Sequence, residues 1–276
     1  MGFQINNNLA ANNSYRNLNA TQNDLSKSLE KLSTGLRINR AADDAAGLSI
    51  SEGLKSQVTG SAQAARNAQD GISVIQTAEG ALTEVHSILQ RVRDLAVQAG
   101  NDSNNADART AIQTEVTALG DELTRIGDAT NFNGIKLLDG SASLTFHIGA
   151  GDDANENQIT VALTAADIST LGADVKALAF DSATSASASI LALDGNIKDI
   201  STERSKLGAA QNRLEHTIKS LNVAGENLQA AQSRIADVDM AQEMVKFTKA
   251  NILSQAGTAM LAQANQSSQG VLSLLR

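Results

Sequence analysis

The 276-residue sequence contains no cysteine, no proline and no tryptophan, and its large rings are limited to five phenylalanines and one tyrosine. Without cysteine no thiolate nucleophile is possible, although the absence fits an oxidising and a reducing compartment equally well. Large rings usually supply much of the burial in a compact core, so we do not expect a thick globular core. The absence of proline removes the commonest helix breaker and favours long, uninterrupted helices.

The charge balance is acidic, with a formal net charge of -8 at pH 7. Phosphate binding needs a basic face, so nucleic acid is not an expected partner. The acidity is concentrated between Asp139 and Asp181, where seven acidic residues stand against one lysine. The flanking parts of the chain are therefore almost neutral, and we expect the acidic segment to face solvent.

Signals for membrane insertion, for a cleaved leader and for catalysis are also missing. No segment is apolar enough for membrane insertion, and the opening MGFQINNNLAANNSY lacks the basic start and apolar run of a signal peptide. We therefore expect any export to proceed without a cleaved signal peptide. The motifs HExxH, GxGxxG and GxxxxGK(S/T) are absent, so we expect no enzyme activity, no cofactor and no metal site. The neighbours Asp43 and Asp44 are interpreted as ion-pair partners of Arg37 or Arg40.

The second half of the chain carries a sustained heptad repeat. Apolar residues recur every seven positions, and a second track three or four residues away adds Ile190, Ile197 and Ile218. This spacing predicts one long helix over about residues 190–235, whose apolar stripe needs a partner helix. The seven-residue track, which we call the bundle seam, consists of Leu193, Ile200, Leu207, Leu214, Leu221, Leu228 and Ile235.

The first half of the chain supplies candidate partners for that stripe. A leucine stripe at residues 18–36 is followed by an Asp-rich joint at 39–47 and a longer apolar stripe at 54–96. A shorter amphipathic helix is predicted at about 106–129.

The period changes to two in the middle of the chain. Apolar and polar residues alternate at 144–148 and again at 159–163, with the turn-rich segment GAGDDANEN between them. This pattern predicts one β-hairpin with a long loop. Residues 165–189 are small, polar and weakly patterned, and we interpret them as a linker, with an O-glycosylation target as the alternative. The predicted fold is mainly α: long antiparallel helices form a coiled coil or helical bundle with one small β-hairpin region.

The two ends of the chain carry almost no charge. No charged side chain occurs in residues 1–15 or 250–275, which are rich in Asn, Gln, Ser and Ala. These segments are too polar for a bilayer core and too poor in charge for an ordinary surface. We expect them to be disordered in a free monomer and to become ordered between copies. The residues predicted to drive self-assembly are Phe3, Ile5, Leu9, Leu18, Leu25, Leu32, Leu253, Leu261, Leu272 and Leu275.

Several long motifs resemble the signatures of bacterial flagellins. In the first half they are LEKLSTGLRINRAADDAAGLSIS (29–51), QRVRDLAVQAGN (90–101) and TNFNGIKLLDG (130–140). In the second half they are AQSRIADVDMAQE (231–243), ILSQAGTAMLAQANQ and the final VLSLLR. The resemblance covers roughly the first 140 and the last 85 residues, while the segment between them is much shorter than in large flagellins.

The resemblance implies a structural subunit that is exported and self-assembles into the extracellular flagellar filament for motility. It implies a terminal coiled-coil domain of residues 1–42 and 236–276 that lines an inner tube. Residues 43–140 with 190–235 would form a helical bundle domain, and 141–189 a β-hairpin and short variable surface segment. The implied partners are other copies of the chain, an export chaperone, and cap and hook-junction proteins.

Recognition by host flagellin receptors is a further implication of the resemblance. The positions that match the receptor-binding patch are Gln90, Arg91, Leu95 and Glu115. Cytosolic sensors of flagellins recognise C-terminal leucines, and the matching positions in this sequence are Leu272, Leu274 and Leu275. For both sets, packing between subunits is the favoured primary role, with recognition incidental to it.

Two alternatives to a filament subunit share part of the sequence pattern. A hook–filament junction protein shares the paired terminal helices, but such proteins usually lack the full NFNGIKLL segment and the SLLR ending that are present here. A soluble coiled-coil signalling protein predicts charged termini, which this chain lacks.

Overall fold

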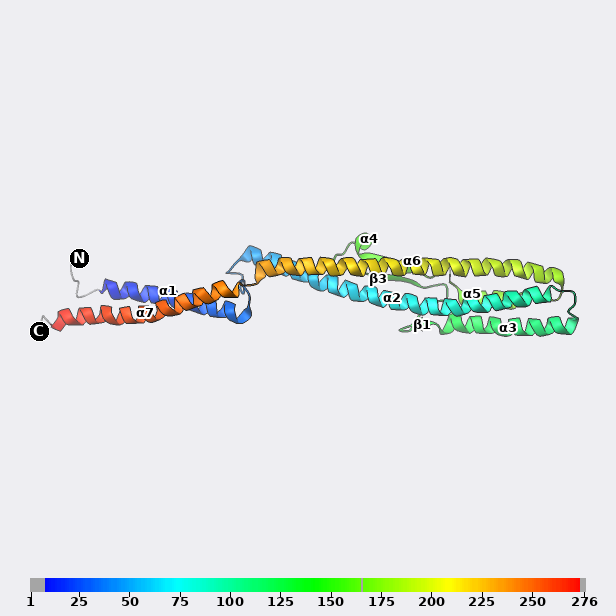
Figure 1. Ribbon diagram of the computed structural model, residues 1–276, viewed down its shortest axis with the longest axis horizontal. Helices are drawn as coiled ribbons and strands as arrows, with labels where there is room; N and C mark the ends of the chain where they lie inside the picture. The colour runs from blue at the N-terminus through cyan, green and yellow to red at the C-terminus, as the bar shows by residue number, and fades with distance from the viewer. Residues whose placement is uncertain (1–7, 165, 274–276) are drawn as a thin grey trace. The chain divides into compact units, whose positions relative to one another are not determined.

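The computed structural model describes residues 8–164 and 166–273, with side chains described up to residue 266. Within these residues the elements follow in the order α1 (Leu9–Thr34), α2 (Ala45–Ala99), α3 (Ala106–Ala129), β1 (Asn131–Phe132), β2 (Ile135–Lys136), β3 (Ser143–His147), α4 (Ala154–Asn157), β4 (Gln158–Ala162), α5 (Ile168–Lys176), α6 (Ala183–Ala236) and α7 (Met240–Ser273) (Figure 1). The predicted mainly α fold is confirmed. The chain divides into two compact units: unit 1 holds Met1–Ser56 and Asn227–Arg276, and unit 2 holds Gln57–Glu226.

Unit 1 is built on the antiparallel pairing of α1 with α7, which run side by side in Figure 1. The α1 helix begins where the Asn8 side chain accepts the Ala11 N–H at 3.0 Å. It ends at Gly35, whose φ of 74° places it in the left-handed region and lets its N–H donate to the Lys31 carbonyl. Because glycine tolerates this conformation, the helix ends there without strain.

The Asp-rich joint after α1 closes onto the end of α6. The Arg37 N–H donates to the Ala236 carbonyl at 2.6 Å, and its guanidinium donates to the Ile235 carbonyl. Arg37 also pairs with Asp44 at 3.5 Å, which confirms the ion-pair interpretation of that carboxylate. Asp43 instead accepts the backbone N–H groups of Arg40 and Asn39, and these hydrogen bonds lower the pKa of its carboxyl.

Unit 2 is a helical bundle with an aliphatic core. In Figure 1, α2 lies between α6 and α3, and ion pairs join it to both: Arg93 to Asp194 at 2.6 Å and Arg91 to Glu115 at 2.7 Å. Ile75, Leu82 and Leu89 of α2 are fully buried and belong to one cluster with the α3, α5, α6 and hairpin residues. The core contains few rings, as the composition led us to expect.

The predicted β-hairpin is confirmed as β3 paired antiparallel with β4. The register sets Leu144 opposite Val161 and Phe146 opposite Ile159, so that the apolar side chains alternate with exposed polar ones. A second, much shorter hairpin joins β1 and β2 through Asn133 and Gly134, which both have positive φ. The sequence pattern did not predict this second pair.

The linker predicted for residues 165–189 is wrong. Part of it forms α5, which buries Ile168 and Val175, and Phe180 beyond it is 1% exposed. The α6 helix begins at Ala183, several residues before the predicted start near 190. Helix α5 packs so closely on α3 that glycines face the opposing chain. A Cβ built on Gly127 would lie 2.8 Å from the Ser169 backbone nitrogen, and one on Gly172 would lie 2.7 Å from that of Thr124.

Candidate self-assembly surface

The α1–α7 pair is held by polar contacts along its whole described length. Asn8 donates from its amide to the Ala264 carbonyl at 2.9 Å, and the Ser254 hydroxyl donates to Gln22 at 3.2 Å. Between them, Gly257 approaches Leu18 so closely that an added Cβ would lie 3.1 Å from a Leu18 methyl group. The alignment of the two helices is therefore fixed by specific groups as well as by apolar contact.

The end of the pair where α7 begins contains a buried carboxylate. The Ser28 hydroxyl donates to one oxygen of Glu243 at 2.7 Å, and Lys246 donates to the other at 3.0 Å. Both Ser28 and Glu243 are buried. Burial alone would raise the pKa of Glu243, but the hydrogen bonds from Ser28 and Lys246, with the positive charges of Lys246 and Lys31, hold it below its usual value. The carboxylate is therefore charged at neutral pH.

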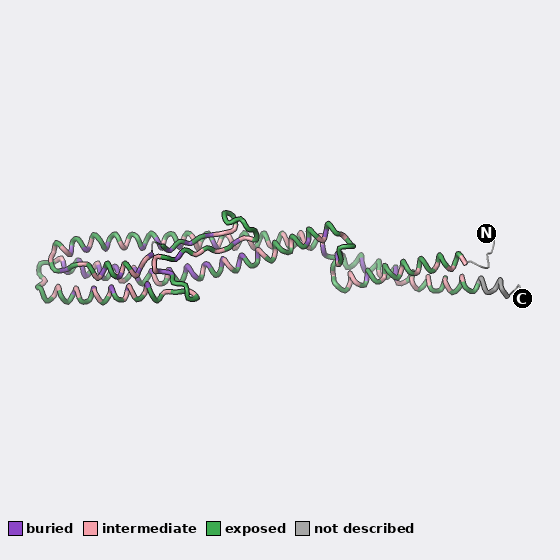
Figure 2. The backbone as a smooth tube through the Cα atoms, turned by 180° about the vertical axis from the view of Figure 1, so that it is seen from behind, coloured by how far each residue is buried: buried purple, intermediate pink, exposed green. Residues whose placement is uncertain are grey.

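Unit 1 exposes an unusually large number of apolar side chains. Eleven of the fifteen large apolar side chains that are exposed in the described chain belong to this unit, although it is the smaller one. Figure 2 shows the same contrast, since buried backbone is concentrated in unit 2 and is sparse in α1 and α7. Exposed apolar groups gathered in one region mark an interaction surface.

The α7 helix has large apolar residues around its whole circumference rather than on one face. A helix of this kind is normally buried on all sides, yet within unit 1 the pairing of α7 is with α1. Its outward side chains, which we call the α7 outer face, are Met240, Met244, Val245, Ile252, Leu253 and Met260, between 48% and 69% exposed.

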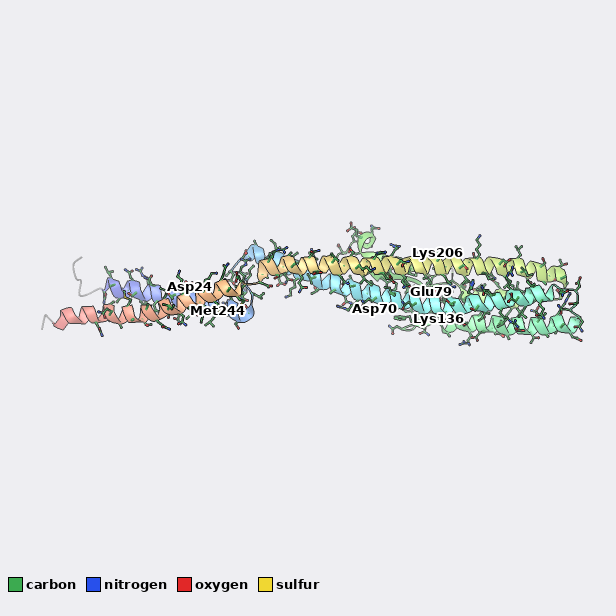
Figure 3. The ribbon with its side chains drawn as sticks, in the orientation of Figure 1. Asp24, Asp70, Glu79, Lys136, Lys206 and Met244 are labelled. Carbon is green, nitrogen blue, oxygen red and sulfur yellow. The ribbon has the colours of Figure 1, made fainter. Side chains whose placement is uncertain are left out.

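Two hollows accompany this face. An apolar groove of about 480 Å³ runs along α7 and is lined by Met244, Val245, Thr248, Lys249, Ile252 and Leu253. Met244 is labelled on α7 in Figure 3. A second hollow of about 390 Å³ lies between α1 and α7, where four lysines and one aspartate surround the Ser28–Glu243 contact: Lys27, Lys31, Lys246, Lys249 and Asp24. Apolar contact along α7 is thus flanked by a cluster of positive charge.

The residues predicted for self-assembly are distributed unevenly over this surface. Leu9 and Leu253 are 67% and 48% exposed, whereas Leu18, Leu25, Leu32 and Leu261 are partly covered in the α1–α7 pair. Phe3, Ile5 and Leu275 lie outside the described residues, and the side chain of Leu272 lies outside the described side chains. Sequence reasoning missed Met240, Met244, Val245 and Ile252, which a plot of apolar residues around the full α7 helix would have revealed.

The bundle seam lies on both units. Leu193, Ile200, Leu207 and Leu214 are buried in the core of unit 2, and Leu221 is half-buried there. Leu228 and Ile235 are half-buried in unit 1. The seam is therefore most completely covered in the part of α6 that belongs to unit 2.

The positions matched to a receptor patch fall on α2 and α3. Gln90, Arg91 and Glu115 are exposed, and the Arg91 guanidinium donates two hydrogen bonds to Glu115. Leu95 is 2% exposed and packs in the unit 2 core, so its side chain has no surface to offer a partner. Leu274 lies beyond the described residues, as does Leu275.

Two other kinds of site were not found in the part of the chain that the structure describes. Among the residues at 8–164 and 166–273, no group of three or more His, Asp or Glu side chains is placed to hold a metal ion. None of the described helices is long and apolar enough to cross a membrane. The described residues form a helical framework with a large uncovered apolar face, which is typical of a structural subunit that packs against other proteins.

Comparison with known proteins identifies which subunit this is. Residues 5–143 match the bacterial flagellin N-terminal helical region, and residues 190–275 match the bacterial flagellin C-terminal helical region. The chain is 54% identical to the flagellin of Halalkalibacterium halodurans over 99% of each chain. It is 49% identical to the flagellin of Bacillus subtilis, over 99% of this chain and 100% of that one.

The chain belongs to the bacterial flagellin family. As such it is a structural subunit of the extracellular flagellar filament and not an enzyme. Only residues 144–189 separate the two matched regions, so this is a small flagellin that lacks large outer domains. A solved structure assigned as a flagellar hook-associated protein of Vibrio parahaemolyticus aligns with a TM-score of 0.57 at 15% identity, over 71% of this chain and 100% of that one. That likeness extends to the fold alone.

Proposed function

We propose that copies of the chain pack in the filament through unit 1, and that the α7 outer face is buried against the terminal helices of neighbouring copies. The observation that carries this proposal is the apolar circumference of α7, of which α1 covers one side. Each outer-face side chain is already about a third to a half covered, so its complete burial contributes about 1 kcal/mol. The pairing is repeated in every copy, so these small contributions add up along a polymer.

In this arrangement each region of the chain has one main role. Residues 1–42 and 236–276, including Phe3, Ile5, Leu272 and Leu275, form the inner tube. Residues 43–140 with 190–235 form the bundle that the seam makes rigid. Within residues 141–189, the exposed acidic loop between β3 and β4 is turned to the outside, whereas β4 and α5 contribute to the bundle core. The terminal segments become fully ordered only when neighbouring copies cover them.

A substitution on the α7 outer face tests this proposal. Ile252 is 61% exposed, so Ile252→Asp should alter the folding of the monomer by less than about 0.5 kcal/mol. In the polymer the carboxylate introduced at position 252 would be buried without a partner, and we expect filament growth from seeds to stop. Ile252→Leu is the matched control and should polymerise as the unchanged chain does. Filament growth by Ile252→Asp at the normal rate would refute the proposal.

Partners outside the filament follow from the same surface. An apolar face of this size needs cover before assembly, which supports escort of the C-terminal segment by an export chaperone. Growth then takes place beneath a cap, on a base of hook-junction proteins. We further propose type III export without a cleaved signal peptide. The intact mass of subunits from washed filaments should include the opening residues, and a mass lacking them would exclude this route.

Host flagellin receptors are proposed to contact the α2–α3 surface. Gln90, Arg91 and Glu115 are exposed there and offer a charged, hydrogen-bonding patch. Leu95 is left out of this set because it is buried. We expect Arg91→Ala to weaken receptor signalling by monomer while leaving filament assembly measurable. The cytosolic sensors would read Leu272, Leu274 and Leu275, which a C-terminal truncation series would test.

A further inference from the structure

The sulfur atoms of the described chain are confined to one helix. The sequence has no cysteine and four methionines. Three of these, Met240, Met244 and Met260, lie on α7 with exposed fractions of 48%, 48% and 62%. The buried cluster of unit 2 contains no methionine at all, although methionine is ordinarily a core residue. The thioethers of Met240, Met244 and Met260 therefore lie on the surface that the proposed function assigns to subunit contact.

We propose that these methionines, and Met244 foremost, are a reversible oxidation site through which hydrogen peroxide blocks assembly. The inference rests on the proposed role of the α7 outer face. The thioether sulfur attacks one oxygen of the peroxide, the O–O bond breaks, and the sulfur gains that oxygen as a sulfoxide. The two peroxide hydrogens leave with the second oxygen as water, so the sulfur is oxidised and the peroxide reduced. Reductases specific for methionine sulfoxide reverse the change.

The groove around Met244 explains why a sulfoxide there opposes packing. The Thr248 hydroxyl already donates to the Met244 carbonyl at 2.8 Å, so its proton is engaged. Lys249 carries the other side-chain donor that lines the groove. A buried sulfoxide oxygen therefore either lacks a hydrogen bond or takes the Lys249 ammonium into the contact. Both outcomes are unfavourable, whereas the unoxidised thioether fits an apolar contact without any donor.

Sensitivity to oxidant is expected to depend on the state of assembly. In the unpolymerised chain the sulfur-bearing side chains are about half exposed, and no cysteine competes for the oxidant. Once neighbouring copies cover the α7 outer face, peroxide loses access to the same sulfurs. Oxidation thus acts on subunits that are waiting to assemble and spares those already in place.

The test uses the full-length chain, hydrogen peroxide as the oxidant, and peptide mass mapping to locate each added oxygen. Oxidation of the unchanged chain should raise the critical concentration for seeded growth about 10- to 100-fold, equivalent to about 1.4–2.8 kcal/mol. The triple variant Met240→Leu, Met244→Leu, Met260→Leu should grow normally before and after the same treatment. This variant retains Met1 as its one remaining methionine, so the mass of the Met1 peptide shows that the oxidant was active. Treatment with methionine sulfoxide reductase should restore growth of the oxidised chain.

A second variant separates Met244 from its neighbours. Met244→Gln places a permanent polar group in the groove and should impair growth without any oxidant, whereas Met244→Leu should not. The proposal is overturned if oxidised chain grows normally, or if the triple variant loses growth on treatment. Failure of the proposed function would look different, because Ile252→Asp would then form filaments as readily as Ile252→Leu.

Discussion

The close packing of α5 on α3 predicts opposite outcomes for the same substitution at two glycines. Gly127 of α3 faces the backbone of α5, and an added Cβ would lie 2.8 Å from the Ser169 nitrogen and 3.1 Å from the Ile168 carbonyl carbon. Gly80 lies on the exposed face of α2, and a Cβ there would meet nothing within 4 Å. Both changes to alanine gain about 0.8–1 kcal/mol of helix propensity. Only Gly127→Ala must also displace a neighbouring backbone.

The helix-propensity gain and the overpacking cost together decide whether each substitution raises or lowers the free energy of unfolding. Overpacking of a well-packed contact costs about 1–3 kcal/mol, and the lower part of that range applies to flexible side chains rather than to backbone. Gly127→Ala should therefore destabilise unit 2 by about 1–2 kcal/mol after the propensity gain. Gly80→Ala should stabilise it by about 0.5–1 kcal/mol.

The assay is urea unfolding of the full-length monomer, followed by far-ultraviolet circular dichroism. The two variants should have midpoints on opposite sides of the unchanged chain, with similar slopes. If the Gly127→Ala chain were as stable as the Gly80→Ala chain, the reasoning would be refuted. The α5 backbone would then move aside for the added Cβ with no loss of unfolding free energy. Gly172→Ala, directed at the Thr124 nitrogen from the opposite helix, should repeat the loss.

Three further results are expected. Leu214→Asp buries an unpaired charge at a fully buried seam position, so it should cost about 3–5 kcal/mol and abolish cooperative unfolding of unit 2. Glu243 has a lowered pKa, so the stabilisation from its partners is complete above about pH 5 and is lost as the pH falls through that pKa. Filaments of Glu243→Gln should consequently dissociate over a shifted and shallower acid range, and an unchanged profile would exclude Glu243 as a contributor. Arg91→Ala removes an exposed ion pair and should change unfolding by less than about 1 kcal/mol in thermal melts; a loss above 2 kcal/mol would contradict its surface placement.

Long elements were predictable because their signal is repeated many times. The α6 helix carries its apolar track over six heptad steps, and α3 has apolar residues at regular spacing, so both were identified from period alone. The hairpin of β3 and β4 was predictable because its period of two differs from that of the helices. Its register then follows from setting the apolar side chains of both strands on one face.

The short elements depended on contacts that a linear pattern does not contain. The α5 helix has nine residues and includes Gly172, which lowers its intrinsic helix propensity. Its stability comes from burial against α3, including the glycine contacts. The start of α6 was placed too late because its first turns contain only small residues. There the Ser182 hydroxyl accepts the Ser185 N–H at 3.1 Å and helps begin the helix.

The candidate surface was only partly predictable for a related reason. A search for stripes selects residues that share one face, and it found leucines that pair α1 with α7. The outward residues of α7 stand at other angles, so no single stripe includes Met244, Val245 and Ile252. The resemblance, in turn, matched Leu95 by position, and only the packed structure distinguishes that buried side chain from its exposed neighbour Arg91.

The scarcity of aromatic residues gives the molecule a built-in optical reporter. Tyr15, the single tyrosine, lies on α1 with 56% of its surface exposed, and there is no tryptophan to dominate its emission. Fluorescence excited in the tyrosine band therefore comes from unit 1 alone, because unit 2 contains phenylalanine but no tyrosine and no tryptophan. Quenching and anisotropy of that one emitter can test, with no attached dye, whether the terminal helices pass from solvent into the polymer.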